Sequence, residues 1–196
     1  MILFKFSKTD GAEYVSHLDL LRHITRTLRR ANIPVATSEG FNKHPRIFLN
    51  NPLGLGVKSV AEFGTIDTPF TGDFKTVFNA HSPKGVKCVD FRVSDKAGDY
   101  ANSIVQCTYS VLGFSAFDVD EILGAEQIVI TDLRNRTVDI RPRIFDLHFE
   151  GETLFFTLGC GENNLRPDLF CTFLESRYNG KTRSLIKIAS HGENTF

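Results

Sequence analysis

Four arginines recur within one short segment at spacings that place them on one side of a helix. They are Arg22, Arg26, Arg29 and Arg30. Residues three, four or seven apart lie on neighbouring helical turns, so the side chains form a stripe. A guanidinium group is planar, permanently charged and able to donate two hydrogen bonds at once, which suits phosphate oxygens. Only Asp19 lies close enough on the segment to neutralise them. We predict contact with phosphate or RNA, the alternative being a solvated helix face.

A second candidate for ligand binding is the loop of residues 38–45, with the sequence Ser-Glu-Gly-Phe-Asn-Lys-His-Pro. It combines a flexible glycine with an aromatic ring, an amide and an imidazole, and loops held by a rigid sheet often carry function. Phe41 is suited to stack on an unpaired base, unless it instead packs into the core of a turn. The predicted binding residues of this loop are Ser38, Gly40, Phe41, Asn42 and His44. We expect the loop and the arginine stripe to fold toward each other into one electropositive pocket.

Two histidines are candidates for acid–base catalysis, because imidazole titrates near neutral pH. These are His17 and His44, although the sequence does not show which of them, if either, is catalytic. No metal site is predicted. His17 and His23 are separated by about 600° of helical rotation and so lie on different faces. Helix capping explains Asp19 without a catalytic role.

The four cysteines argue against a metal or cluster held by this chain alone. Cys88, Cys107, Cys160 and Cys171 are far apart and form no CxxC pair. That spacing fits neither a structural zinc site nor an iron–sulfur cluster. We expect free thiols in a reducing compartment, and no cofactor. With no apolar run of the roughly 18–20 residues that a membrane span needs, we expect a cytoplasmic protein without membrane contact.

Hydrophobic periodicity predicts a scaffold for the arginine stripe within residues 1–94. Ile2–Phe6 alternates like a strand, and Lys8–Gly11 has the composition of a polar turn. Ser16 and Asp19 form a capping box before a helix that ends near Asn32, since Pro34 disfavours helical geometry before it. The apolar face of this helix is predicted to contain Leu21, Ile24, Leu28 and Ala31.

The same half continues with strands at residues 46–49, 60–66 and 86–93. Between the last two, Thr71 is positioned to cap a second helix. The buried stripe of that helix is predicted to be Phe74, Val77 and Phe78. The order strand, helix, strand, strand, helix, strand is that of a ferredoxin-like split βαβ unit, with helices on one face of the sheet.

The order partly repeats after a polar segment at residues 94–102, the best linker candidate. Strands are predicted at 104–112, 128–130, 137–140, 144–149, 154–158 and 184–188. Ser115 and Asp118 form a second capping box, and Pro167 suits the first turn of a helix. We therefore predict an α+β protein of two tandem ferredoxin-like units with antiparallel sheets, at residues 1–94 and 95–196.

Charge is divided unevenly between these halves. The whole chain has 23 basic and 23 acidic residues. Residues 1–94 contain 13 basic and 8 acidic residues, a net charge of +5, and the remaining residues carry −5. Any polyanion is therefore expected on the first half.

Several segments together resemble a radical-SAM-associated family of unknown function. The first block of the resemblance is Tyr14–Arg22, Arg29–Ala31, Ile33-Pro34, Ser38–Asn42 and His44-Pro45, continued by Pro52-Leu53, Gly56, Ser59 and Glu62. Weaker matches are Val138–Pro142 and Leu165–Pro167. Lys43 departs from the pattern, where the family usually has proline. Because that family's domain is often fused to or encoded beside a cobalamin-binding radical SAM protein, the resemblance implies an accessory module whose partner carries the cluster.

Three functions remain open at this point. The first is a binding module that presents a substrate, plausibly RNA, to a radical SAM partner enzyme. The second is a metal-independent endoribonuclease-like enzyme that uses a histidine, which rests on fold analogy. The third is a protein-interaction domain. The sequence favours the first and makes catalysis by this chain alone the less expected case.

Overall fold

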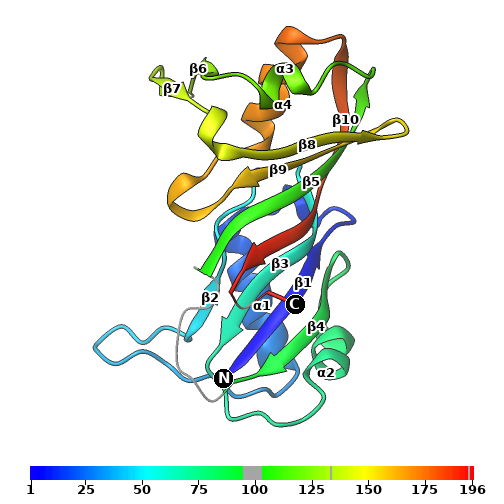
Figure 1. Cartoon of the computed structure of the whole chain (residues 1–196). Coiled ribbons are helices and arrows are strands. Elements are labelled where there is room, and N and C mark those ends of the chain that lie inside the picture. Colours follow the sequence, from blue (N-terminus) through cyan, green and yellow to red (C-terminus); the bar gives the residue numbers. More distant parts are fainter. Residues whose placement is uncertain (95–102, 133, 194) are drawn as a thin grey trace. The chain divides into compact units, whose positions relative to one another are not determined.

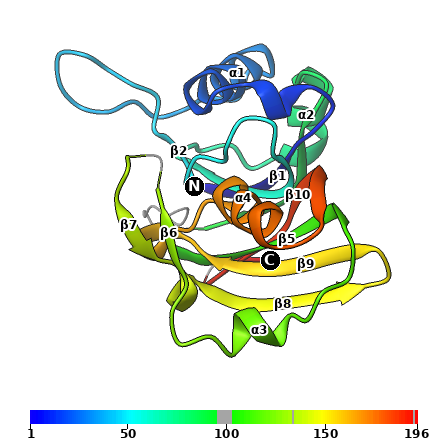
Figure 2. The same cartoon turned by 90° about the horizontal axis from the view of Figure 1, so that it is seen from above.

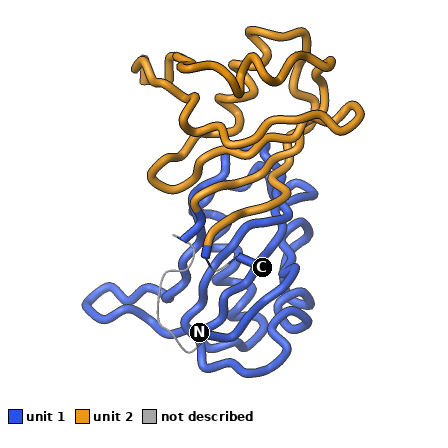
Figure 3. The backbone as a smooth tube through the Cα atoms, in the orientation of Figure 1, with its two compact units in different colours: residues 1–104, 193–196 blue, residues 105–192 orange. Residues whose placement is uncertain are grey.

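The computed structural model describes residues 1–94, 103–132, 134–193 and 195–196, and these form an α+β protein with mostly antiparallel strands and few helices. The predicted fold class is confirmed at this level. The chain divides into two compact units (Figure 3): unit 1 comprises residues 1–104 and 193–196, and unit 2 comprises residues 105–192. The predicted linker falls mainly on residues 95–102, which lie outside the described ranges.

Unit 1 contains six of the expected elements in the expected order (Figure 1). They are β1 (Ile2–Lys8), α1 (His17–Arg30), β2 (Ile47–Leu49), β3 (Lys58–Ile66), α2 (Phe74–His81) and β4 (Val86–Val93), with a short 3-10 turn, η1 (Ala12–Tyr14), before α1. Within this unit the strands lie in the order β4, β1, β3, β2, and each neighbouring pair is antiparallel.

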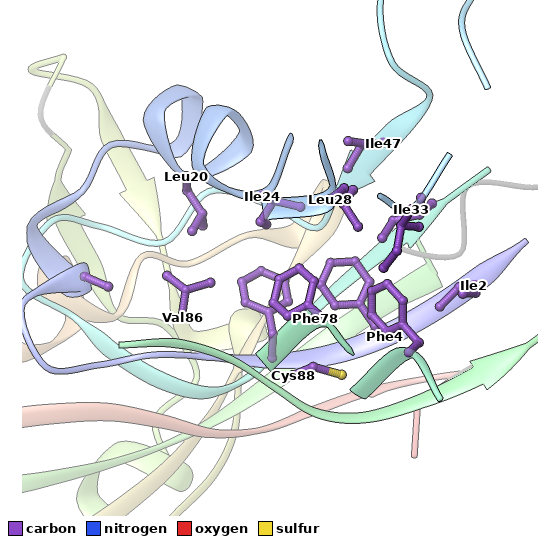
Figure 4. Close-up of a cluster of buried hydrophobic side chains, with 14 residues drawn as sticks. Ile2, Phe4, Leu20, Ile24, Leu28, Ile33, Ile47, Phe78, Val86 and Cys88 are labelled. Atoms are coloured by element: carbon purple, nitrogen blue, oxygen red, sulfur yellow. The ribbon is translucent and has the colours of Figure 1, made fainter. Parts of the chain in front are cut away.

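The core of unit 1 lies between this sheet and its two helices (Figure 4). Phe4 on β1 packs against Phe74 and Phe78 of α2, with ring centroids 5.5 and 5.8 Å apart. From α1, Ile24 and Leu28 are fully buried against the same cluster. The abundance of phenylalanine in the sequence is thus used to fill the space between the helices and the sheet.

The first helix follows its sequence signals closely. The Ser16 hydroxyl accepts a hydrogen bond from the backbone N–H of Asp19 at 3.2 Å, so the predicted N-cap is confirmed. The helix ends at Arg30, and Asn32 adopts a left-handed conformation with φ of 52°. Leu20 is more deeply buried than the predicted Leu21, a shift of one position on the apolar face.

Two predicted helix caps were wrong. Asp73, and not Thr71, caps α2 by accepting a hydrogen bond from the Thr76 N–H at 3.1 Å, because Phe74 must already be helical to reach the core. In unit 2 the helix near the second capping box begins only at Asp120 and has no side-chain cap. Ser115 lies between β5 and this helix, and its N–H donates to the Asn179 carbonyl at 3.3 Å.

Unit 2 contains a longer series of elements. They are β5 (Ile104–Phe114), α3 (Asp120–Leu123), β6 (Val129–Thr131), β7 (Thr137–Asp139), η3 (Arg141–Arg143), β8 (Ile144–Glu150), β9 (Thr153–Gly159), η4 (Gly161–Asn163), α4 (Pro167–Arg177) and β10 (Gly180–Gly192). Its main strands lie in the order β10, β5, β9, β8, while β6 and β7 form a separate hairpin. Both β5 and β8 pair with β9 in antiparallel register.

Helix α4 packs on the main sheet of unit 2 (Figure 2). Phe170 of α4 meets Phe156 of β9 with ring centroids 5.0 Å apart, and Tyr109 of β5 stacks on the same ring. Pro167 is the first residue of the helix, as predicted, since proline has no N–H to leave unsatisfied there. The last strand is longer than the predicted 184–188.

All four cysteines are buried free thiols, as expected. Burial raises the pKa of the Cys88 and Cys171 thiols to about 12, so both are protonated and unreactive at neutral pH. Among the described residues, no helix is both long and apolar enough to cross a bilayer.

Candidate functional site

The four predicted arginines all lie on exposed positions of α1, but their surroundings differ. Arg22 donates to the Asp19 carboxylate at 2.8 Å, and both side chains are at least half exposed. Arg30 donates to the His81 carbonyl at the end of α2, at 2.6 and 3.2 Å. The guanidinium groups of Arg26 and Arg29 form no hydrogen bond or ion pair with any described residue. Two guanidinium groups are therefore uncompensated, one is neutralised and one is held by the backbone.

Asp19 forms its hydrogen bonds at the start of the helix. Hydrogen bonds from Ser16 and then from Arg22 lower the pKa of its carboxyl group, so Asp19 remains ionised at neutral pH. The Ser16 hydroxyl lies 2.7 Å from one carboxylate oxygen and Arg22 occupies the other. Asp19 thus caps α1 and offsets one arginine.

The loop of residues 38–45 is a narrow projection of unit 1 (Figures 1 and 2). Its two sides are joined where the Ser38 N–H donates to the His44 carbonyl at 2.8 Å and the His44 N–H donates to the Ser38 hydroxyl at 3.0 Å. A bridge between Thr37 and Pro45 closes the base. Gly40 has φ of 112°, a conformation that side-chain-bearing residues rarely adopt.

Phe41 is fully exposed, with a relative accessibility of 103%. The alternative in which this ring packs into the core of a turn is therefore excluded. Replacing a fully exposed phenylalanine should change the stability of the fold little. Both faces of its ring are accessible to a partner. Asn42 beside it is also exposed, as is the predicted binding residue His44.

The stripe and the loop are connected in sequence but are not tied together by side chains. Across the part of the chain that the structure describes, no hydrogen bond or ion pair joins an α1 arginine to residues 38–45. The single electropositive pocket expected from the sequence therefore stays a prediction, and a ligand that used both sets of residues would bridge them. Within the loop, Ser38 and His44 are joined by hydrogen bonds.

Sequence reasoning missed a group of buried charges near the start of α1. Lys8, Glu13 and Glu62 are 2%, 5% and 3% exposed. Lys8 was predicted to lie in a polar turn, but it is the last residue of β1 and continues the alternating stripe of Ile2, Phe4 and Phe6 into the interior. Glu62 faces the same side, because it lies directly opposite Phe6 in the antiparallel pair of β1 and β3.

Glu13 links this group to two loops. One carboxylate oxygen accepts the Gly11 N–H at 2.8 Å, and the other lies 3.9 Å from the Lys58 ammonium. The Glu13 carbonyl accepts the Gly56 N–H at 2.9 Å, which fixes the loop before β3. The period of two extending from the core stripe to Lys8 was the signal available in the sequence.

His17 is the first residue of α1 and lies within the field of these charges. Burial lowers the pKa of its imidazole, Glu62 acts in the opposite direction, and Lys8 reinforces the lowering. Burial also lowers the pKa of the Lys8 ammonium, against the charges of Glu62 and Glu13. The imidazole of His17 is therefore mainly neutral at neutral pH and able to accept a proton. His44, by contrast, stands on the exposed loop.

No group of three or more His, Cys, Asp or Glu side chains is arranged to hold a metal ion within the described residues. His17 and Asp19 lie near each other in sequence, but Asp19 is used in capping. The chemistry that unit 1 offers is thus ionic and stacking contact on its surface, with one partly buried neutral imidazole.

Comparison with known proteins shows which family the chain belongs to. The family model described as an uncharacterized protein conserved in bacteria (DUF2344) matches residues 1–167. No curated protein matches the chain. A crystal structure of a Cbf5-Nop10-Gar1 complex aligns with 96% of this chain at 9% identity and a TM-score of 0.47, over 48% of its own chain. A crystal structure of the archaeal box H/ACA sRNP Nop10-Cbf5 complex aligns with 95% at 11% identity and a TM-score of 0.44, over 46%. The chain spans about half the length of these matched chains, and at these scores the similarity assigns no function.

Proposed function

Since the chain belongs to the uncharacterized bacterial family DUF2344, we propose its function from its own surface: an accessory module that binds RNA through unit 1. The observation that carries the proposal is the pair of exposed, uncompensated guanidinium groups of Arg26 and Arg29 on the basic half of the chain. Solvated phosphates gain most from cations that no protein carboxylate already neutralises.

The loop of residues 38–45 supplies the second part of the RNA surface. Phe41 is placed to stack on a base, while Asn42 offers amide donors and acceptors to base edges. Single-stranded RNA suits this arrangement, because its bases are free to reach a projecting ring while its phosphates follow the helix. Arg22 and Arg30 would add weaker contacts, as each already has an internal partner.

A radical SAM enzyme is the proposed recipient of the bound RNA, which rests on the family resemblance of the first block of motifs. In that arrangement the iron–sulfur cluster belongs to the partner. The four cysteines of this chain are buried and separately placed, so they offer no obvious ligand set of their own. Co-purification that resists high salt and nuclease would point instead to a plain protein-interaction domain.

Both units are proposed to be ferredoxin-like. In unit 1 the spatial order β4, β1, β3, β2 places the fourth strand beside the first, which a split βαβ unit requires. In unit 2 the order β10, β5, β9, β8 repeats this arrangement if the β6–β7 hairpin and α3 stand where the first helix would be. The tandem would thus have one complete and one modified copy.

The RNA proposal is tested by charge reversal on the full chain. Arg26→Glu with Arg29→Glu is expected to weaken binding of a single-stranded RNA at least about tenfold at low salt. The log–log salt dependence should become shallower by about 1.4, because two phosphate contacts are lost. Filter binding over a salt series measures both quantities.

The matched control is Lys75→Glu with Lys84→Glu, which changes the net charge of unit 1 equally but lies off α1. Both lysines are exposed, so the fold should be unaffected. Binding close to the wild-type level is expected for this control. Equal losses in the two double variants would reduce the effect to net charge and refute a site on α1.

A second candidate function, metal-independent RNA cleavage, is favoured by one observation only. His17 is half-buried at the start of α1, and burial lowers the pKa of its imidazole, which favours the neutral form that a general base requires. Wild-type protein should then cleave RNA in the presence of EDTA, and His17→Gln should abolish cleavage while His44→Gln should not. If RNA stayed intact after long incubation with the wild-type protein, the cleavage hypothesis would be wrong and the binding module would remain the proposed function.

A further inference from the structure

A cavity of about 430 Å³ in unit 2 collects four arginines from distant parts of the sequence. They are Arg134, Arg136, Arg143 and Arg166. The first two come from the turn of the β6–β7 hairpin, the third from η3, and the last precedes α4. This volume lies in the range of pockets that hold small organic ligands.

Three of the arginines are held in place by internal contacts. Arg136 forms a two-point contact with the Asp132 carboxylate, at 2.9 Å from Nε and 2.7 Å from Nη2. Arg143 donates from Nη1 to the Asn164 carbonyl at 3.1 Å, and Arg166 forms a two-point contact with Asp168. Such contacts restrict the rotamers of long side chains, which reduces the entropy lost when a ligand binds.

The cavity keeps an excess of positive charge after these pairings. Backbone and side-chain hydrogen bonds from Arg136 lower the pKa of Asp132 to about 2, so this lining carboxylate is ionised and largely satisfied. Among the described residues, no carboxylate pairs with the side chain of Arg134 or of Arg143. Unit 2 as a whole carries 9 basic and 12 acidic residues, so composition alone does not place four arginines together.

One part of the cavity wall is apolar and continues into a second hollow. Ile130 and Leu169 line the arginine cavity and also a neighbouring one of about 520 Å³. Phe173 lies in the second hollow, one helical turn beyond Leu169 on α4. A ligand with an anionic group at one end and an apolar or aromatic body at the other would satisfy both parts.

We propose that these two hollows bind a phosphate monoester with an apolar or aromatic body, its phosphate contacting Arg134 and Arg143 and its body lying over Ile130 and Leu169 toward Phe173. The dianionic phosphate matches the surplus of two cations, and the planar guanidinium forks match its oxygens. Residues of the two later motifs of the family resemblance line the same cavity. They are Val138, Ile140, Leu165 and Arg166. This site is independent of RNA binding by unit 1.

The proposal is tested by calorimetric titration of the full chain with four probes. These are AMP, adenosine, octyl phosphate and inorganic phosphate, each up to about 1 mM, a concentration that detects affinities of that order. Binding of AMP but not adenosine would support a nucleotide, and binding of octyl phosphate alone would support a lipid-like ester. If inorganic phosphate bound with the same affinity as both esters, the apolar body would contribute nothing to binding, and that part of the proposal would be wrong.

Variants then locate the binding. Arg134→Gln with Arg143→Gln should weaken binding of the responding ester at least about tenfold, since two charge-assisted contacts to the phosphate are lost. Arg183→Gln, an exposed arginine of β10 that does not line the cavity, serves as the control and should leave affinity unchanged. No heat with either ester, or equal loss in the control, would overturn the proposal, with melting temperatures confirming that each variant is folded.

Discussion

Unit 1 and unit 2 present arginines in opposite ways. On α1 the guanidinium groups stand on a convex helical surface, and Arg26 and Arg29 have no described partner. In unit 2 four guanidinium groups line a cavity, and three are anchored by internal contacts. The two proposals therefore assign one residue type to two kinds of recognition, of a long flexible polyanion on a helix and of a compact anion in a hollow.

The physical difference is the degree of restraint, because Arg134, Arg136 and Arg166 are exposed like the arginines of α1. Charges on an exposed helix interact through water and are screened by salt, so their contribution to affinity depends on how many phosphates they contact. Guanidinium groups that internal contacts already hold in place lose less entropy when a ligand binds, so each contact contributes more to affinity.

Salt gives the largest expected separation between the two surfaces. Raising the salt from about 50 to about 200 mM should weaken RNA binding about 50-fold, because four phosphate contacts on a single strand give a log–log slope of about −2.8. Binding of a phosphate monoester in unit 2 should fall by less than about tenfold over the same range. Filter binding measures the salt dependence for RNA, and calorimetry measures it for the ester. Equal log–log slopes for the two ligands would contradict the proposed difference between the two surfaces.

Removal of the exposed ring tests the loop. Phe41→Ala is expected to weaken RNA binding about tenfold, within the about 1–3 kcal/mol found for stacking of a base on an aromatic side chain. The melting temperature should not change, as the ring makes no packing contacts. Phe41→Tyr keeps a stacking surface and should retain affinity. If Phe41→Ala also retained it, the loop would have no part in binding.

Arginine-to-lysine exchange tests anchoring. Arg143→Lys should weaken ester binding in unit 2 about fivefold, because a lysine cannot reproduce a planar fork in a fixed geometry. Arg26→Lys should change RNA binding less than about twofold, since a point charge suffices on a solvated helix. Affinity titrations of both variants decide the matter. A larger loss for Arg26→Lys would reverse the comparison.

The smallest effect concerns pH and the folded state of unit 1. Because the pKa of His17 is lower in the folded chain than in the unfolded chain, the unfolded chain binds more protons just below the ordinary histidine pKa. Stability is therefore lost as the pH falls through that window. His17→Gln should reduce this loss, as measured by urea unfolding at about pH 7.5 and about pH 5. An unchanged pH dependence would mean that His17 is not perturbed.

Local signals in the sequence were enough for most elements. The alternation of Ile2, Phe4 and Phe6 and the cap at Ser16 mark β1 and α1, because both patterns depend on neighbours in the chain. The exposure of the arginines followed from the helical spacing. Thr71 and Ser115 were misassigned as caps, since a cap depends on which later residue must enter the core.

The remaining features depend on contacts between distant residues. Lys8 was predicted to lie in a turn because a charged residue normally ends a strand pattern, although the period of two from Ile2 to Phe6 extends to it. The acidic residue near it, Glu62, could be identified only from the pairing of β1 with β3. The cavity of unit 2 joins Arg134 and Arg166, which are separated in the sequence by the strands β7, β8 and β9. Their spacing in the sequence carries no periodic signal, so the pocket was not predicted.

The central claim is that RNA contacts unit 1 through α1 and the loop of residues 38–45. Ultraviolet crosslinking of the full chain to a single-stranded RNA, followed by mass spectrometry of the linked peptides, tests it most directly. Crosslinks are expected in the peptides that contain residues 22–30 and 38–45, with Phe41 as a principal position. Crosslinks confined to residues 129–177 of unit 2, with those two segments unmodified, would contradict the claim.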